Sequence, residues 1–494
     1  MKVHKHIIFC FLLILISCTS FSQLSFKKNI DIHIDTSFFP SIDSIYHLHI
    51  NNVSIKGNKK TKDYVILREA QVKPGDSINT VNLYNIIEQA RQNIYNTTLF
   101  TEVKINTIAI DAFNMNIEII VKEKWYIFPT PQFKLVDRNY KEWSKVYHRD
   151  LQRVIYGVKF AHYNLSGRRD QLRVYFVNGY SRGVAISYTA PYSNNKLTEG
   201  FSVGINFAQG REINYGTSYS NKLLFFSEKP INANINSLIS KGFSFSASYR
   251  KRKGIFNTHI FNASYSYLNV TDSIKIKYNP NYFGNTSSSI SFPDFSYTYA
   301  HNKVDNIAYP LIGKSMFLTL NKRGLGFTGK ANMFAVQAGY NKFIDLGKEW
   351  YLISSSMASV KLPFTQPYIN QRGLGFGGAV LRGLELYAID GVAFAISKTT
   401  LKKKIAAFNL RLPFAIPFFL KGKEKIPFSF YAKTYTDLGY SYNKTNDSFL
   451  NRRFLYTAGI GLDVLTFYDF VIRVEYSINQ LNEKGLFLRV QTGL

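Results

Sequence analysis

The chain has 494 residues and carries 61 Lys and Arg against 32 Asp and Glu, a formal net charge of +29. This length allows more than one domain, and the abundance of Tyr (34) and Phe (41) favours β-strands. An excess of positive charge this large suggests that the chain binds nucleic acid, anionic lipid or an acidic protein. The basic residues are scattered, however, and their densest runs, 251–253 and 402–404, have no nucleic-acid-binding signature beside them, so we interpret these runs as solvated turns and expect no nucleic-acid partner.

The N-terminus has the pattern of a secretory signal peptide over residues 1–22. Lys2 and Lys5 precede an apolar run at 7–16, and small residues precede Gln23. An alternative interpretation takes Leu-Ile-Ser-Cys at 15–18 as a lipobox, in which Cys18 would be lipidated. Both cysteines of the chain lie in this segment, so ordinary cleavage leaves a mature chain with neither disulfide nor thiolate chemistry.

The sequence predicts an irregular leader or linker at residues 23–45. It predicts a small α+β domain at residues 46–125. An extended run at 47–55 is followed by a short helix that Thr61 can cap. A second helix begins near Thr80, and its apolar residues share one face: Leu83, Ile86, Ile87, Ala90 and Ile94. Two alternating strands follow at 100–110 and 113–122. The order β-α-α-β-β predicts a small sheet with both helices on one face.

Three short stretches of this domain carry a family resemblance: Gly-Asn-Lys-Lys-Thr at 57–61, Gly-Asp at 75–76 and Leu-Phe-Thr-Glu-Val at 99–103. They resemble a POTRA domain, the periplasmic module of the BamA/TamA outer-membrane superfamily, whose members combine POTRA domains with a surface-antigen-type barrel. The resemblance covers one complete unit.

After a predicted linker at 126–150, residues 151–494 consist of runs of about ten residues separated by turn residues, the pattern of a transmembrane β-barrel. In 470–479 every second residue is apolar, and 427–439 and 486–490 alternate likewise. A soluble β-sandwich would also alternate, but the signal peptide, the aromatic content and the lack of an eighteen-residue apolar run favour the barrel. We expect a mainly β chain with about sixteen strands, a number partly guided by the family, and longer loops on one side at Arg211, 281–288 and 371–390.

The most unusual of these loops is the glycine-rich segment 364–391. Its residues Gly373, Gly375 and Gly378 fit the dinucleotide-binding pattern G-x-G-x-x-G, but no helix follows them. We expect these glycines and Gly377 to let the chain fold back through a crowded lumen. In the BamA/TamA superfamily the loop after the eleventh strand folds into the barrel and carries Val/Ile-Arg-Gly-Phe/Tyr at its tip. This sequence has Leu-Arg-Gly-Leu at 381–384, which departs from that signature at both flanks.

The resemblance also implies a partner for Arg382 and Gly383. The family places an aspartate in a Phe/Tyr-x-Asp-x-Gly motif on a following strand, and residues 435–439 match it with Asp437. A guanidinium in a narrow lumen needs such a carboxylate to avoid an unpaired, partly desolvated charge. Asp463 is a second candidate because it shares the inward face of the next strand with Gly459 and Gly461. The alternative is that Arg382 is an exposed loop arginine.

The resemblance implies that the chain inserts or translocates unfolded outer-membrane or secreted client polypeptides, with outer-membrane lipid and possible accessory lipoproteins as further partners. The terminal strand at 484–494, with Gly485, Phe487 and Leu494, would form a barrel seam with the strand near 153–163. The nine histidines show no metal-ligand spacing and no G-x-S-x-G occurs, so we expect no enzyme, no metal and no cofactor. The alternative function is a passive channel or lipid-handling barrel.

Overall fold

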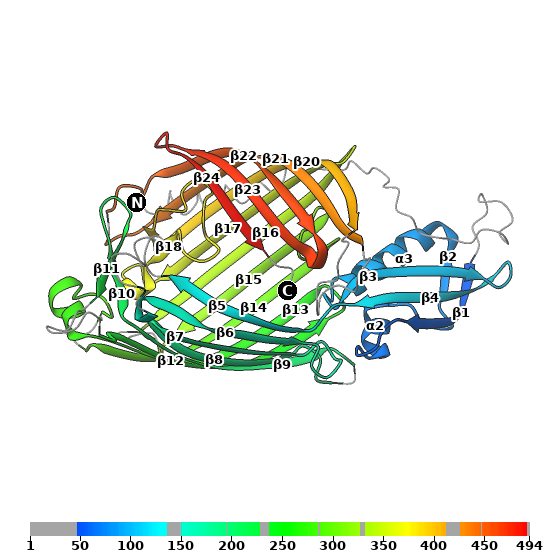
Figure 1. The fold of residues 1–494 in the computed structure, drawn as a ribbon, viewed down its shortest axis with the longest axis horizontal. Helices are drawn as coiled ribbons and strands as arrows, with labels where there is room; N and C mark the ends of the chain where they lie inside the picture. The colour runs from blue at the N-terminus through cyan, green and yellow to red at the C-terminus, as the bar shows by residue number, and fades with distance from the viewer. Residues whose placement is uncertain are drawn as a thin grey trace.

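The computed structural model describes residues 47–135, 149, 151–194, 196–227, 237–284, 287–326, 331–411, 425–445 and 447–491. The predicted signal peptide and leader, Cys18 and Leu494 lie outside the described residues. A small α+β domain lies against one end of a large barrel (Figure 1). We call this the domain end of the barrel and the opposite one the loop end.

The N-terminal domain has the predicted order of elements with one short strand added. It comprises β1 (His47–Lys56), α2 (Asp63–Ala70), β2 (Ser77–Asn79), α3 (Thr80–Tyr95), β3 (Phe100–Ala109) and β4 (Asn114–Glu123). The sheet order is β2-β1-β4-β3, with β1 and β4 parallel. Because β2 has only three residues, no alternation in the sequence could reveal it.

The two helices pack on the sheet through the apolar residues that the spacing predicts. Leu83, Ile87, Ala90 and Ile94 of α3 are at most 4% exposed, whereas Ile86, which the predicted stripe included, is 36% exposed. The predicted cap at Thr61 is wrong: α2 has Lys62 as its N-cap and no side-chain cap bond. The Thr61 hydroxyl instead contacts the hydroxyl of Tyr126 and the amide of Asn164, at the junction with the barrel.

Sixteen antiparallel strands form the barrel sheet, in agreement with the expected number. Their bounds are β5 (Ile127–Leu135), β6 (Val154–Tyr163), β7 (Gln171–Gly179), β8 (Ser181–Ala190), β9 (Glu199–Gly210), β12 (Ser240–Lys253), β13 (Asn257–Val270), β14 (Ser289–Val304), β15 (Gly313–Arg323), β16 (Met333–Gly347), β17 (Trp350–Leu362), β20 (Ala393–Arg411), β21 (Lys425–Tyr442), β22 (Phe454–Thr466), β23 (Phe470–Asn479) and β24 (Lys484–Gln491).

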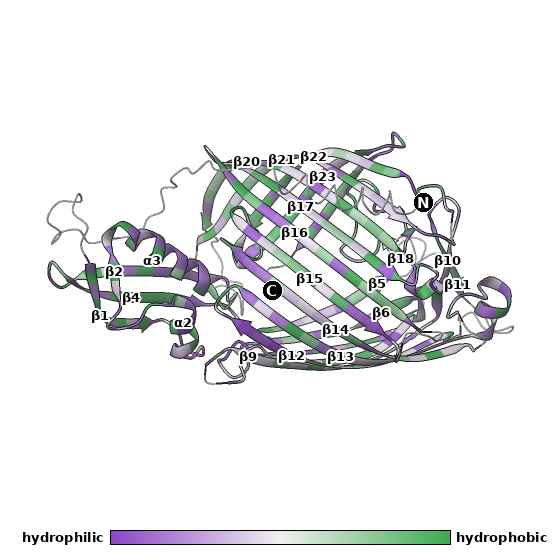
Figure 2. Ribbon diagram, turned by 180° about the vertical axis from the view of Figure 1, so that it is seen from behind, coloured by the Kyte–Doolittle hydropathy of each residue, from purple (hydrophilic) through white to green (hydrophobic). Residues whose placement is uncertain are grey.

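Hydrophobic and hydrophilic residues alternate along many of the barrel strands (Figure 2), and the exposure of individual side chains distinguishes the two faces of the sheet. On β24, Leu486, Leu488 and Val490 are 72%, 69% and 56% exposed. On β23, Glu475 and Ser477 are buried although both are polar. In a soluble β-sandwich, apolar side chains are buried and polar side chains face outward. This sheet has the reverse arrangement, which is typical of a barrel whose exterior contacts lipid.

The predicted linker at 126–150 is corrected by the structure, because β5 occupies residues 127–135 and pairs with β6. Pro129 and Pro131 conceal this strand in the sequence, since proline cannot donate to a sheet ladder and is confined mainly to edge strands. β5 is indeed an edge of the sheet. Residues 136–148 and 150 lie outside the described part of the chain.

The long connections lie at the loop end. They contain the hairpin β10 (Glu212–Thr217) and β11 (Leu223–Ser227), the short helix η2 (Ile274–Tyr278), and the loop between β17 and β20 with η3 (Tyr368–Asn370), β18 (Arg372–Leu374) and β19 (Ile389–Asp390). One of the connections at the domain end contains η4 (Phe467–Asp469). In the described part of the chain, no helix is long and apolar enough to cross a membrane.

Candidate functional site

The loop between β17 and β20 enters the lumen and brings its tip against β21 and β23. Gly383 has φ +87°, and a Cβ there would lie 2.9 Å from the Ser477 Cβ on β23, so only glycine fits. Gly375 and Gly377 also have positive φ, and Gly373 lies close to the backbone of β19, whereas Gly378 has open space around it. Gly373, Gly375, Gly377 and Gly383 therefore allow the loop to fold back into the lumen as the sequence predicts. Gly378 has no such structural requirement.

Arg382 and Asp437 are in direct contact. The Arg382 backbone N–H donates to Asp437 Oδ2 at 2.9 Å, and its Nε donates to the two carboxylate oxygens at 3.1 and 2.9 Å. Its Nη2 also donates to Oδ1. Asp437 is 0% and Arg382 8% exposed, so the alternative of an exposed loop arginine is excluded. The guanidinium carbon lies 3.8 Å from the centre of the Tyr435 ring, which adds a cation–π contact.

The two leucines that flank Arg-Gly explain the departure from the family signature. Leu381 and Leu384 are 2% and 3% exposed and belong to a cluster with Leu374, Ile389, Phe394, Ile396, Leu450 and Leu455. The cluster joins the loop tip to the barrel wall and to the β21–β22 connection. Apolar packing therefore anchors the tip on both sides of the Arg382 ion pair.

Asp463 does not pair with Arg382. Its carboxylate lies 3.0 Å from Lys402 Nζ and 2.5 Å from Lys433 Nζ, and it accepts a hydrogen bond from the Tyr309 hydroxyl at 2.8 Å. The second carboxylate near Arg382 is instead Glu475, whose Oε1 lies 3.9 Å from Arg382 Nη1 and 2.7 Å from Lys433 Nζ. Buried charges of both signs thus continue from the loop tip along the lumen wall.

Glu385 ties the loop to the last strand of the sheet. Its carboxylate accepts from the Gly383 backbone N–H at 2.7 Å and pairs with Arg489 of β24. Asn479 of β23 donates to the Gly383 carbonyl at 2.9 Å. The loop therefore contacts β21, β23 and β24, the last of which is an edge of the barrel sheet.

Two of the three residues predicted to form the barrel seam lie on this edge strand. Gly485 and Phe487 lie on β24, and a Cβ at Gly485 would be 2.8 Å from the Phe487 ring. The other edge is β5 and not the strand at 153–163, because β6 pairs on both sides, with β5 and β7. Within the described residues, β5 and β24 each pair with one neighbour only.

The N-terminal domain is held to the barrel by Asp469 in the β22–β23 turn. Asp469 accepts hydrogen bonds from Lys124 Nζ at 2.9 Å, the Tyr95 hydroxyl at 2.8 Å and the Asn306 amide at 3.2 Å. Lys124 and Tyr95 belong to the domain, whereas Asn306 belongs to the β14–β15 turn. The side chain of Lys124 is 1% exposed, so this is a buried contact between the two parts.

A second buried contact joins the domain to the barrel through Glu69 of α2. Its carboxylate accepts two hydrogen bonds from Arg252 of β12 and one, at 2.7 Å, from the Tyr192 hydroxyl. Burial raises the pKa of Glu69, but the hydrogen bonds and the positive charge of Arg252, with the bond from Tyr192, outweigh it and hold the pKa below its ordinary value of 4.5.

Docking of the domain is therefore expected to weaken in acid. Since the docked state lowers the pKa of Glu69, this contact contributes its full stability above pH 4.5, and the contribution is lost as the pH falls below that value. Spin labels on α3 and on the barrel should report a broader distance distribution at pH 4 than at pH 7. Glu69→Gln should remove most of this change. Glu88→Gln, which breaks an ion pair within α3, should keep it.

No group of three or more His, Cys, Asp or Glu that could hold a metal occurs among the residues with described positions. The barrel does contain a cavity of about 930 Å³ toward its loop end. Five basic residues line it, namely Arg182, Lys241, Arg323, Lys361 and Arg372, and no Asp or Glu is among its described lining residues.

Comparison with known proteins identifies the N-terminal domain. The POTRA family model, described as surface antigen variable number repeat, matches residues 48–124, which confirms the resemblance seen in the sequence. No curated protein matches the chain.

Similar solved structures include BamA from Haemophilus ducreyi lacking POTRA domains 1–3, with 14% identity, a TM-score of 0.48, and coverage of 90% of this chain and 84% of that one. They also include CdiB from Escherichia coli, with 12% identity, a TM-score of 0.49 and coverage of 90% and 75%. CdiB from Acinetobacter baumannii has 11% identity, a TM-score of 0.45 and coverage of 90% and 73%.

Proposed function

We propose that this chain, which carries one POTRA domain followed by a sixteen-stranded barrel, inserts or translocates client polypeptides at the outer membrane. The barrel would lie in that membrane with the POTRA domain in the periplasm. Its clients would be unfolded outer-membrane or secreted polypeptides, and accessory lipoproteins are possible partners. The proposal assigns no catalytic residue and no cofactor.

The observation that carries the proposal is that the described sheets of both parts of the molecule end in edge strands. β5 and β24 each have one unpaired side in the described barrel sheet, and β3 is an edge of the POTRA sheet. An edge strand offers a row of backbone N–H and C=O groups that an extended polypeptide can pair with. A client could thus be held first at the POTRA edge and then at the barrel edge.

The contact between the loop and β24 suggests how the barrel edge is controlled. Glu385 pairs with Arg489 of β24, and Arg382, three residues earlier in the loop, pairs with Asp437 of β21. The loop therefore bridges four consecutive strands, β21 to β24, and would brace the edge against separation.

A depletion experiment tests the proposed function. After the chain is depleted, we expect a census of the outer-membrane and secreted proteomes to show loss of client proteins, with complementation by the wild-type chain. Broad loss of barrel proteins would indicate assembly, and loss of one secreted protein would indicate dedicated secretion. Unchanged proteomes, with the chain shown to be absent, would contradict the proposal.

A passive channel is the second candidate function, favoured by the basic cavity of about 930 Å³ at the loop end. Positive charge along a pore attracts anions and repels cations. A channel of this kind would show steady conductance in planar bilayers. Under a salt gradient, its reversal potential would have the sign expected for anion selectivity. Depletion would then leave the proteomes unchanged.

A further inference from the structure

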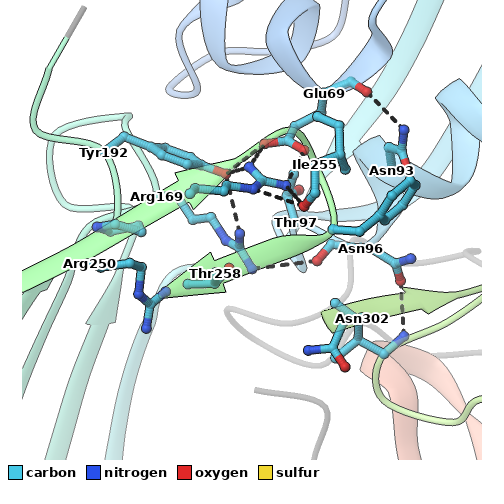
Figure 3. Close-up of a pocket in the computed structure, with 14 residues that line it drawn as sticks. Glu69, Asn93, Asn96, Thr97, Arg169, Tyr192, Arg250, Ile255, Thr258 and Asn302 are labelled. Atoms are coloured by element: carbon cyan, nitrogen blue, oxygen red, sulfur yellow. Dashed lines mark hydrogen bonds and ion pairs between the residues drawn. The ribbon is translucent and has the colours of Figure 1, made fainter. Parts of the chain in front are cut away.

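A cavity of about 160 Å³, which we call the junction cavity, lies between the POTRA domain and the barrel and opens to solvent. Glu69, Asn93 and Asn96 line it from the domain, and Arg169, Arg250 and Thr258 from the barrel (Figure 3). The volume exceeds the roughly 30 Å³ of one water molecule and is below the roughly 300 Å³ at which pockets for drug-sized ligands begin. A small polyatomic ion therefore suits it.

The charged groups of the junction cavity do not balance. Three arginines line it, Arg169, Arg250 and Arg252, against one carboxylate, Glu69, which leaves 3 − 1 = 2 positive charges. The lining contains no other Asp, Glu, Lys or His among the described residues. Three like charges around one cavity repel one another, and a bound anion would relieve this repulsion.

Two of the three guanidinium groups retain unused donors. Arg252 is committed to Glu69 and to the Ile255 carbonyl. Arg169 makes only long bonds, at 3.4 Å to the Tyr192 hydroxyl and 3.5 Å to the Asn96 carbonyl. Among the described residues, no hydrogen bond or ion pair is formed by the side chain of Arg250, which is half-buried. Guanidinium groups are planar forks that bind phosphate and carboxylate oxygens in pairs.

We propose that the junction cavity binds a phosphate-class oxyanion. A dianionic phosphate would neutralise the excess of two charges, and its oxygens would accept from Arg169 and Arg250 while Arg252 remains paired with Glu69. The uncharged donors of Thr258 and Asn302 also line the cavity. The bound group would be an inorganic phosphate, whose dianion matches both charges, or the phosphodiester of an anionic lipid headgroup, whose single charge matches one of them. In either case it would join the POTRA domain to the barrel. This site is independent of client handling.

The test is calorimetric titration of the full chain in detergent with inorganic phosphate, against sodium chloride of equal ionic strength. We expect saturable binding of one phosphate per chain. Arg250→Gln should weaken it at least tenfold, and Arg250→Lys should weaken it less because the charge is kept. The matched control is Arg182→Gln, which removes an arginine from the loop-end cavity and should leave the affinity unchanged. Heat-modified mobility on gels checks that each variant is folded.

The source of the phosphate is distinguished by repeating the titration in phosphatidylcholine nanodiscs with and without phosphatidylglycerol. Competition by phosphatidylglycerol that is lost in Arg250→Gln would identify a lipid headgroup as the ligand, and undiminished binding would identify the free ion. Absence of saturable phosphate binding in wild type, or equal binding by folded Arg250→Gln, would overturn the proposal.

Discussion

Replacing Arg382 with alanine is expected to release the lumen loop and to abolish most of the proposed client handling, while the barrel still assembles. The change leaves Asp437, which is 0% exposed, as a buried carboxylate without its main partner. Breaking a buried ion pair on one side costs about 3–5 kcal/mol. The strand pairs of the barrel do not involve the Arg382 side chain, so the sheet should persist. Mass-spectrometric mapping of chymotrypsin cleavage at 363–392 would report loop release, and depletion followed by complementation would report function.

Matched variants separate the pair from its neighbourhood. Asp437→Asn should release the loop as Arg382→Ala does, whereas the double variant should be more stable than either single one because no buried charge is left unpaired. Arg382→Lys should give an intermediate result, since lysine keeps the charge but not the fork. Arg452→Ala, which breaks an exposed pair with Asp447 in the β21–β22 connection, is the control that should change nothing. If Arg382→Ala kept both loop protection and complementation, the pair would have no locking role.

The parts of this molecule that sequence predicts well are those where a periodic pattern or a short signature decides the structure. β23 spans 470–479 as the alternation indicates, and the number of strands in the barrel sheet agrees with expectation. The Arg382–Asp437 contact was found because each residue sits in a recognisable motif. These features depend on local sequence, and so they can be seen without the structure.

The charged neighbours of the Arg382–Asp437 pair cannot be predicted in this way, because they come from several strands. Lys433, Gly461 and Glu475 lie in one cross-strand row over β21, β22 and β23. A Cβ at Gly461 would lie 2.9 Å from Lys433 Cε, so the glycine leaves room for Lys433 to reach Glu475. Inward-facing Gly461 and Glu475 could be read from alternation, but only the register of three strands shows that they cooperate.

Register also explains why Asp463, the second candidate partner of Arg382, does not pair with it. It faces the lumen as predicted, but it lies two residues beyond Gly461 on β22, opposite Tyr431 rather than Asp437. At that level of the barrel, Lys402 and Lys433 lie close enough to pair with it.

Proline explains why the sequence does not predict β5. The strand contains Pro129 and Pro131, which argue against a strand in the sequence but are tolerated at the edge of a sheet, where one side of the strand forms no backbone hydrogen bonds.

Asp469→Asn is expected to undock the POTRA domain. Lys124 would then be a buried ammonium without a counter-charge, at a cost of about 3–5 kcal/mol to the docked state. Asparagine is the suitable replacement because Asp469 has φ 57°, and asparagine tolerates this left-handed conformation better than most residues. Since Cys10 and Cys18 are the only cysteines of the chain and lie in residues 1–22, spin labels can be placed at Val81→Cys on α3 and Glu349→Cys on the β16–β17 turn.

The distance between the labels should be narrowly distributed in the wild type and broad in Asp469→Asn. Adding Lys124→Met should narrow it again, because methionine fills the space of the lysine stem without a charge that needs pairing. Glu102→Gln, which breaks an exposed pair with Lys104 in the same domain, should leave the distribution as in the wild type. A narrow distribution in Asp469→Asn would mean that the contacts of Glu69, Thr61 and Asn96 hold the domain without Asp469. Broadening without rescue by Lys124→Met would mean that the loss of Tyr95 and Asn306 contacts, rather than the stranded charge, drives undocking.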